Sequence, residues 1–330
     1  MSFFNAYYSE DFEDKLFVEE IIKRWNQGDN EFHIYTSGTS GKPKQITLTR
    51  KLLKWSATST NNKLNLTRHK IMCCLPVQKT GGFMQLIRAL IWECDIQFFK
   101  PSNDPLDSIG EHDFTTISLT PTQFKSSLLK SPEQLNKFRH ILIGGAPLSN
   151  SSSFTSKLNH PQIWLTYGMT ETASHIAMQN LTNNETVLNP LPGVKISQKE
   201  TLQIHIPELN IQLQTNDIAK FREGGFVILG RSDDVINSGG VKIHPHKIET
   251  VIESLFQIMK LQKKFYISKE NHPEYGEIPI LIVEGEPDFN QKHFIETLTP
   301  LLPKYHTPKK ILFTPQIRNT ETGKVIREAY

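Results

Sequence analysis

A ten-residue segment near the N-terminus combines residue types that bind phosphate groups. It reads YTSGTSGKPK over residues 35–44 and contains four Ser or Thr hydroxyls, two glycines and two lysines. Glycine lets backbone N–H groups approach an anion closely, hydroxyls donate hydrogen bonds, and lysine supplies positive charge. The segment therefore predicts a polyphosphate-binding loop, with candidate residues Thr36, Ser37, Gly38, Thr39, Ser40, Gly41, Lys42 and Lys44. A flexible surface hairpin is the alternative for such a loop taken alone.

The spacing within this loop differs from that of the P-loop in nucleoside triphosphatases. That motif places four residues between its first glycine and the Gly-Lys pair, which Ser or Thr and then a helix follow. Here two residues separate Gly38 from Gly41, and Pro43 follows Lys42. The next residues favour a strand, so a P-loop is the wrong interpretation.

Further motifs follow the loop in a fixed order along the chain. They are GGAP at 144–147, YGMTET at 167–172, TND at 215–217, GRSDD at 230–234 followed by SGG at 238–240, and a Gly-Lys pair at 323–324. Together with the loop, they resemble the adenylate-forming superfamily of acyl-CoA synthetases, peptide-synthetase adenylation domains and luciferases. One position departs from the family pattern, because Asn216 replaces a glycine. Asparagine tolerates a positive φ better than most residues, so Asp217 is kept as a site residue.

The resemblance implies an ATP-dependent acid–thiol ligase that works in two half-reactions. A carboxylate attacks the α-phosphate of ATP to give acyl-AMP and pyrophosphate, and the thiol of coenzyme A then displaces AMP. It further implies that Lys324, Thr170 and Glu171 are catalytic. Glu171 would bind Mg²⁺, because a hard cation that bridges phosphate oxygens needs a carboxylate ligand. A surface lysine and an exposed turn glutamate are the alternatives for Lys324 and Glu171.

The other motifs imply nucleotide, hinge and coenzyme A contacts. Tyr167 would stack on adenine, and the opposite wall would comprise Gly145, Ala146 and Pro147. Asp217 would accept hydrogen bonds from both ribose hydroxyls, and Arg231 would reach the ribose as well. A core tyrosine and a hinge salt bridge are the alternatives for Tyr167 and Arg231. Asp233 matches the family hinge, and the pantetheine tunnel would be lined by Ser238, Gly239 and Gly240.

Residues 75–92 correspond to the segment that shapes the acyl pocket in this family. The candidate acyl-substrate residues are Gln78, Lys79, Gly82 and Arg88. The two cations, Lys79 and Arg88, would suit an acid with a second carboxylate, whereas a fatty acid would prefer an apolar tunnel. Surface solvation is the alternative for both side chains. With an arginine at position 88, the chain resembles compact versions of the o-succinylbenzoate–CoA ligases of menaquinone biosynthesis. A general aryl- or fatty-acyl-CoA synthetase and a non-catalytic nucleotide-binding relative remain the alternatives.

Hydrophobic patterns predict the elements that must position these residues. Apolar runs at 71–77, 95–99, 115–119, 140–144 and 162–166 alternate with helical patterns such as 82–94, which favours a parallel sheet covered on both faces. Strands at 31–37 and 44–49 flank the loop, and a helix follows at 50–66. Beyond residue 190 the alternation favours antiparallel sheet, and helices at 245–257 and 289–301 accompany strands at 279–283 and 311–313.

These patterns and the resemblance together predict an α/β protein with the adenylate-forming fold. The large domain would comprise residues 1–231, with a parallel sheet, a small antiparallel part and an N-terminus shorter than is usual in the family. A small mobile α+β domain would comprise residues 232–330, with the hinge near 231–234. The expected small-molecule partners are ATP, coenzyme A and a carboxylic acid, and a homodimer is left open.

Composition excludes several other classes of protein. The chain has 330 residues, of which 37% are hydrophobic, and a net charge of only +3, which gives no support to general nucleic-acid binding. No apolar run reaches the roughly 20 residues of a membrane helix, and the acidic N-terminus is unlike a signal peptide. Three cysteines without a Cys-x-x-Cys pair suggest free thiols in the cytoplasm. His244 and His246 lack a third ligand placed by spacing, so a solvated loop is favoured over a metal site.

Overall fold

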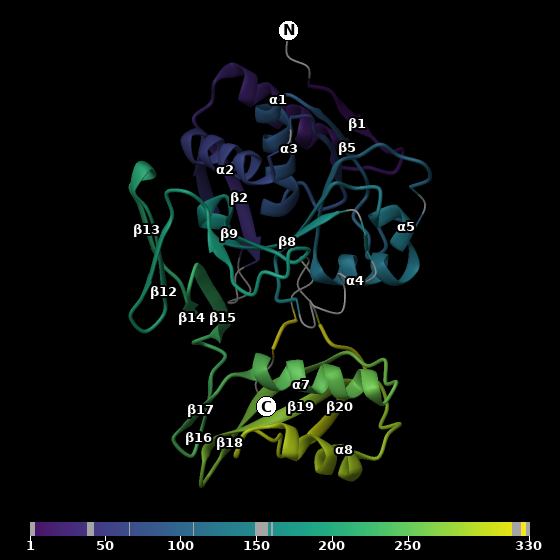
Figure 1. The fold of residues 1–330 in the computed structure, drawn as a ribbon, viewed down its shortest axis with the longest axis vertical. Helices are drawn as coiled ribbons and strands as arrows, with labels where there is room; N and C mark the ends of the chain where they lie inside the picture. Colours follow the sequence, from purple (N-terminus) through teal and green to yellow (C-terminus); the bar gives the residue numbers. More distant parts are fainter. Residues whose placement is uncertain are drawn as a thin grey trace. The chain divides into compact units, whose positions relative to one another are not determined.

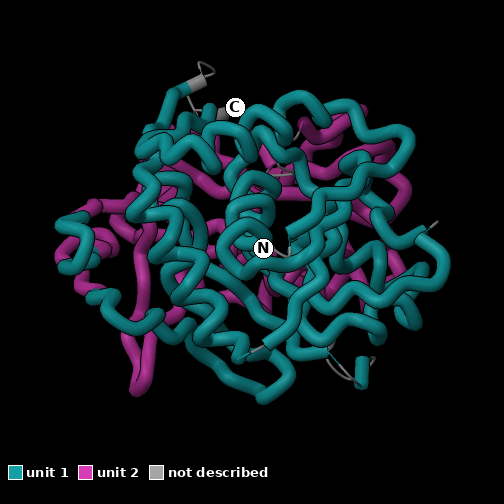
Figure 2. Tube along the Cα trace, turned by 90° about the horizontal axis from the view of Figure 1, so that it is seen from above, with its two compact units in different colours: residues 1–195, 205–211 teal, residues 196–204, 212–330 magenta. Residues whose placement is uncertain are grey.

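The computed structural model describes residues 4–37, 43–65, 67–107, 109–148, 158–159, 161–318 and 325–327, without the side chains of residues 36, 37 and 43. Contacts divide the chain into two units, coloured separately in Figure 2. The first unit comprises residues 1–195 and 205–211, and the second comprises residues 196–204 and 212–330. The predicted domain boundary near 231–234 lies within the second unit and stays a prediction.

An eight-stranded sheet forms the centre of the first unit (Figure 1). Its strands, in spatial order, are β1 (Ala6–Tyr8), β5 (Asp95–Phe98), β4 (Lys70–Cys73), β6 (Thr116–Leu119), β7 (His140–Ile143), β8 (Gln162–Met169), β9 (Ser174–Asn180) and β10 (Asn189–Pro190). Neighbours from β1 to β8 run parallel, whereas β9 and β10 are antiparallel to their neighbours. The predicted parallel sheet and α/β fold class are therefore confirmed.

Helices cover both faces of this sheet. They are α1 (Lys15–Gln27), α2 (Arg50–Leu64), α3 (Thr80–Trp92), α4 (Pro121–Lys130) and α5 (Pro132–Leu135). Ile141 of β7 shares a hydrophobic cluster with residues of α4 and α5, whereas its neighbour Leu142 shares one with Leu64 of α2. Successive strand residues point to opposite faces, so α2 lies on the face away from α4 and α5.

A two-stranded hairpin flanks the predicted phosphate loop. Strands β2 (Glu31–Ser37) and β3 (Pro43–Thr49) pair antiparallel with Ser37 opposite Pro43, so their ends bracket residues 38–42. Phe32, Ile34, Ile46 and Leu48 are buried, which accounts for the alternation seen in the sequence. The Thr49 side chain then accepts a hydrogen bond from the Leu52 backbone and caps α2.

Antiparallel strands and a helix-covered sheet make up the rest of the chain. A three-stranded sheet contains β11 (Lys195–Gln198), β12 (Leu202–Ile206) and β13 (Ile211–Gln214), and a hairpin contains β14 (Asp217–Arg222) and β15 (Gly225–Arg231). The last sheet contains β16 (Ile236–Ser238), β17 (Val241–Ile243), β18 (Phe265–His272), β19 (Gly276–Glu284) and β20 (Ile311–Thr314). Helices α7 (Pro245–Ile258) and α8 (Gln291–Leu298) accompany it.

The core of this last sheet forms as the helical pattern predicts. Ile248, Ile252 and Leu255 of α7 are buried in one cluster with Leu281 of β19 and Phe294 of α8. Strand β18, which pairs with β19 along its whole length, was not predicted. Short 3-10 helices occur at η1 (Thr170–Thr172), η2 (Pro207–Leu209) and η3 (Thr299–Leu301). None of the helices in the described ranges is long and apolar enough to cross a membrane.

Candidate active site

A tight connection between β8 and β9 carries the YGMTET motif of the first unit. The Thr172 hydroxyl accepts a hydrogen bond from the Met169 backbone (3.1 Å) and donates one to the Ser174 carbonyl (2.6 Å). Ala173 adopts a left-handed φ of 58° to close the turn. Thr172 is fully buried, so the backbone that presents Thr170 and Glu171 is held from inside the fold.

Gly168 is required by the close approach of the two strands at this point. A Cβ at Gly168 would lie 2.0 Å from the Ser174 carbonyl oxygen and 2.5 Å from the Cα of His175. The ladder between β8 and β9 also shifts its register between Tyr167 and Gly168. Any larger residue would separate the strands, and the motif therefore needs glycine between Tyr167 and Thr170.

Thr170 lies beside the start of helix α3. Its hydroxyl oxygen is 2.7 Å from that of Thr80, the first residue of α3, and both side chains are partly buried. The sequence offered no signal for Thr80. Glu171 is half-buried, and within the described ranges its carboxylate has no hydrogen-bond or ion-pair partner. One carboxylate with free oxygens fits Mg²⁺, which takes one or two carboxylates together with substrate phosphates.

The predicted adenine wall lies at the same sheet edge as Tyr167. Residues 144–147 follow β7, and Tyr167 lies toward the end of β8, its parallel neighbour. The Thr166 hydroxyl donates to the Ile143 carbonyl (3.0 Å), and a Cβ at Gly144 would lie 2.4 Å from that hydroxyl oxygen. Tyr167 is half-buried, and Gly145 and Pro147 are exposed. Tyr167 and the glycine-rich segment therefore come from the same end of two neighbouring parallel strands.

Arg88 of α3 is buried rather than solvated. Only 4% of the residue is exposed, so the surface alternative is wrong for this residue. Its Nη2 donates to the Ser174 hydroxyl (2.9 Å) and lies 3.4 Å from Nδ1 of His175. Its Nε has no hydrogen-bond partner, and no carboxylate pairs with the guanidinium among the described residues. Burial lowers the pKa of Arg88 to about 10, so the side chain stays charged at neutral pH.

The other predicted acyl-substrate residues lie where α3 begins. Gln78 is exposed and donates to the Asp14 carboxylate (2.7 Å), and Lys79 is half-buried. Gly82 is buried, and a Cβ there would lie 2.4 Å from the Pro76 carbonyl oxygen. Glycine thus lets the first turn of α3 lie directly against the loop that precedes it.

Charged residues of the second unit gather around Arg231. Its guanidinium donates to both carboxylate oxygens of Asp233 (2.9 and 2.7 Å) and lies 3.6 Å from the Asp217 carboxylate. Hydrogen bonding to Asp233 raises the pKa of Arg231. Burial alone would raise the pKa of Asp233, but the hydrogen bonds and charge of Arg231 outweigh it and the pKa is lowered. The salt bridge named as the alternative for Arg231 is therefore present, with Asp217 beside it.

The structure gives a different reason for Asn216 from the one predicted. It is absent from the residues with positive φ, so tolerance of that conformation does not explain the asparagine. The side-chain amide of Asn216 instead donates to the Asp233 carboxylate (3.1 Å). The backbone carbonyl of Asn216 accepts a hydrogen bond from the Ser232 N–H (2.7 Å). The asparagine side chain therefore adds a bond between the TND and GRSDD motifs that a glycine could not make.

The SGG motif forms the turn between β16 and β17. Gly239 and Gly240 both have positive φ, at 56° and 83°, as a two-residue hairpin turn requires. Ser238 is buried, and the Gly239 N–H donates to the Tyr275 carbonyl (2.8 Å). Among the residues that the structure describes, no group of three or more His, Cys, Asp or Glu side chains could hold a metal ion. His244 and His246 therefore belong to no such group.

Several predicted residues lie outside the described part of the chain. These are Gly38, Thr39, Ser40, Gly41, Lys42 and Lys324, together with the side chains of Thr36 and Ser37. Lys44 is described and lies exposed on β3, opposite Thr36.

Arg327 connects the last described residues to α7. It donates to both carboxylate oxygens of Glu249 and to the Ile267 carbonyl (2.7 Å). Its pKa is raised, because the Glu249 carboxylate outweighs the effect of burial.

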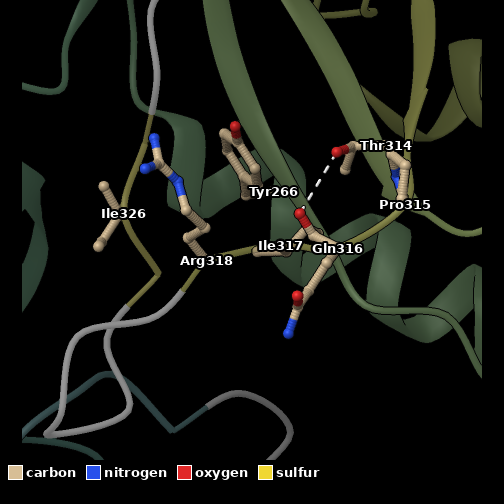
Figure 3. A pocket seen from close by; sticks show the side chains of 7 residues that line it. All are labelled: Tyr266, Thr314, Pro315, Gln316, Ile317, Arg318 and Ile326. Atoms are coloured by element: carbon tan, nitrogen blue, oxygen red, sulfur yellow. Dashed lines mark hydrogen bonds between the residues drawn. The ribbon is translucent and has the colours of Figure 1, made fainter.

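A pocket of about 350 Å³ lies nearby, lined by Tyr266, Thr314, Pro315, Gln316, Ile317, Arg318 and Ile326 (Figure 3). None of these lining residues is among those predicted from the sequence.

The chain is similar to known ligases in both sequence and structure. A 2-succinylbenzoate–CoA ligase of Listeria monocytogenes is 25% identical, with 97% of this chain and 73% of that protein covered. An acyl-CoA synthetase (AMP-forming)/AMP-acid ligase II-like protein of Dyadobacter fermentans is 29% identical with a TM-score of 0.62, and 96% of this chain and 94% of that one are covered. The o-succinylbenzoate CoA synthetase of Bacillus subtilis, solved with ATP and magnesium, has a TM-score of 0.78 at 22% identity, with 98% and 78% covered.

A family model matches the part of the chain that contains most of the candidate site. The model described as AMP-binding enzyme matches residues 6–205, which include the predicted phosphate loop, the adenine wall and the YGMTET motif. The matched segment is more than half of the chain. This chain therefore belongs to the AMP-binding enzyme family.

Proposed function

We propose that this protein is an ATP-dependent acid–CoA ligase that forms an acyl-adenylate, and that its acid is 2-succinylbenzoate. Family membership supports the adenylate chemistry. The curated ligase from Listeria monocytogenes and the synthetase from Bacillus subtilis carry that substrate in their names and support the choice of acid. Menaquinone biosynthesis is the pathway that this activity would serve.

The burial of Arg88 without a carboxylate partner among the described residues is the observation that supports a dicarboxylic acid. A buried guanidinium without a carboxylate partner is costly unless a ligand supplies the opposite charge. Arg88 contacts Ser174, which directly follows the turn that presents Thr170 and Glu171. An acid that reacts near Thr170 could therefore place a second carboxylate at Arg88. A fatty acid would leave that charge unpaired.

The first half-reaction would use the residues around η1 and the predicted phosphate loop. The loop would hold the β- and γ-phosphates, and Thr170 would contact the α-phosphate. Glu171 would hold Mg²⁺, which neutralises charge on the phosphates when bound. Tyr167 and the wall at Gly145, Ala146 and Pro147 would bind adenine. Asp217 would accept hydrogen bonds from the ribose hydroxyls.

The second half-reaction would follow a rotation at the hinge. We place the boundary of a mobile C-terminal domain near residues 231–234, where Arg231 and Asp233 form their ion pair. Lys324 would serve adenylation, and the Ser238–Gly240 turn would line the coenzyme A tunnel. The three buried free cysteines support a reducing location such as the cytoplasm.

The activity is tested by turnover of defined acids. We expect pyrophosphate release from ATP, Mg²⁺ and 2-succinylbenzoate, followed by coenzyme A thioester formation. Replacing Arg88 by Met should lower kcat/KM for this acid by about 10- to 100-fold, because it removes hydrogen bonds from a charged donor. Lys54→Met, which removes an exposed lysine of α2 with no predicted site role, is the control.

Other outcomes would point to the alternatives. Turnover of medium-chain fatty acids or benzoates, without turnover of 2-succinylbenzoate, would assign a general acyl- or aryl-CoA synthetase. No pyrophosphate exchange into ATP with any acid would indicate a nucleotide-binding relative without catalysis.

A further inference from the structure

A chain of hydrogen bonds links α2, β9 and α3 within the first unit. The Thr60 hydroxyl of α2 lies 2.9 Å from Nε2 of His175 and donates to the Ser56 carbonyl (2.8 Å). On the other side of the ring, Nδ1 of His175 lies 3.4 Å from Nη2 of Arg88. Thr60, His175 and Arg88 are all buried, with at most 4% of each residue exposed. Nothing in the motifs required a histidine at position 175.

The hydrogen-bond partners assign the proton on His175. A threonine hydroxyl has one hydrogen, and Thr60 gives it to the Ser56 carbonyl. Thr60 must therefore accept from His175, which places the ring hydrogen on Nε2. The lone pair of Nδ1 then faces both the Arg88 Nη2 and the Ser174 hydroxyl, each 3.4 Å away. Burial, and after it the charge of Arg88, lower the pKa of His175 well below its ordinary value, so the ring is neutral.

A neutral acceptor has a different effect on Arg88 from that of a carboxylate. An aspartate or glutamate at this position would pair with the guanidinium and cancel its charge. His175 and Ser174 instead accept hydrogen bonds through neutral atoms, and Nε is left without a partner among the described residues. The charge of Arg88 is therefore held in one orientation and remains uncompensated.

We propose that His175, fixed by Thr60, is a positioning residue that orients Arg88 toward the second carboxylate of a dicarboxylic substrate. The inference rests on the proposed function, since it assigns a specificity role within that same site. It predicts that selectivity between dicarboxylic and monocarboxylic acids depends on His175 although His175 need not touch the substrate. Thr60 acts through His175 by accepting the Nε2 hydrogen.

The test compares kcat and KM for 2-succinylbenzoate with those for its two monocarboxylate analogues. These are 4-oxo-4-phenylbutanoate, which lacks the ring carboxylate, and 2-propanoylbenzoate, which lacks the side-chain carboxylate. Whichever analogue the wild-type enzyme activates is the reference. His175→Leu should lower the preference for the dicarboxylic acid about 10-fold, mainly through KM, with kcat for the analogue retained.

Three further variants separate positioning from a general packing role. His175→Asn retains an acceptor near the Nδ1 position and should keep most of the preference. His175→Asp should lose more of it than His175→Leu, because it pairs with Arg88. Thr60→Val preserves the buried volume and should lose part of the preference, which provides the test if His175→Leu does not fold. Urea unfolding monitors the integrity of each variant.

The possible failures are distinguishable. A wild-type enzyme without preference for 2-succinylbenzoate would overturn the proposed function and this inference with it. A strong wild-type preference that His175→Leu, His175→Asp and Thr60→Val all leave unchanged would overturn the inference alone. An equal loss toward both acids in these variants would assign His175 a purely structural role.

Discussion

At the scale of single residues, sequence motifs and spatial neighbours carry different information. Thr170, Glu171 and Asp217 were predicted as site residues from motifs that are continuous along the chain, and their roles stay predictions. Arg88 was predicted as a substrate residue, but its burial was not, because its partner Ser174 lies 86 residues away. Thr60, Thr80 and His175 carried no local signal. Their roles depend on contacts that only the folded chain creates.

Lys324→Ala is the residue-scale prediction that rests on the motif alone. An ammonium that meets developing phosphate charge stabilises only the adenylation transition state, so its loss should slow pyrophosphate exchange on the order of 100-fold. Thioester formation from preformed acyl-AMP should change little. Lys309→Ala, which removes an exposed lysine of the same unit, is the control. Equal slowing of both half-reactions would contradict both the role of Lys324 and the domain rotation.

At the scale of elements, local patterns predicted strands well where burial alternates. The predicted strand at 31–37 has those bounds in the structure, and its neighbour at 44–49 differs by one residue. Strand β9 was missed because it is buried on both faces and includes the polar residues His175 and Asn180, which hide the apolar pattern. The antiparallel pairing of β9 with β8 is a property of the turn at η1, which no periodicity encodes.

Two glycines at the start of α3 allow a prediction about packing. Alanine favours helix over glycine by about 1 kcal/mol, but a Cβ at Gly82 would lie 2.4 Å from a backbone oxygen. Gly82→Ala should therefore destabilise the protein by about 1–3 kcal/mol. At Gly81 the nearest atom is the flexible end of Leu75, at 2.9 Å, so Gly81→Ala should be nearly neutral. Urea unfolding followed by tryptophan fluorescence measures both, and equal effects would refute the packing argument.

At the scale of the whole molecule, the alternation of strands and helices along the sequence predicted the fold class. Strands alternating with helices specify a covered parallel sheet whatever the exact ends, and this was confirmed. The division into units could not be read from composition, because residues 196–204 and 212–230 group with the C-terminal part through pairings such as Asp217 with Arg231. Long-range pairing thus decides which segments fold together.

Stability of the whole fold should fall in mild acid through two histidines, the buried His140 and the half-buried His69. Burial lowers the pKa of His140 and of His69 to about 4, and Nδ1 of His140 accepts a hydrogen bond from the Trp164 indole (3.0 Å). The unfolded chain takes up protons below its pKa of about 6.5 whereas the folded chain does not. This contribution is therefore present above about pH 6.5 and is lost as the pH falls toward 4, by at most about 1.4 kcal/mol per pH unit for each proton.

The contribution of His140 can be isolated by one substitution. His140→Asn keeps an acceptor for the Trp164 indole but cannot titrate, so its urea midpoint should fall less than that of the wild type between pH 7 and pH 5. All four tryptophans lie in the first unit, so their fluorescence reports on this sheet. His293→Asn, at an exposed histidine, should follow the wild-type curve. Parallel curves for His140→Asn and the wild type would show that His140 gains its proton without unfolding, and the buried indole bond would then not control acid stability.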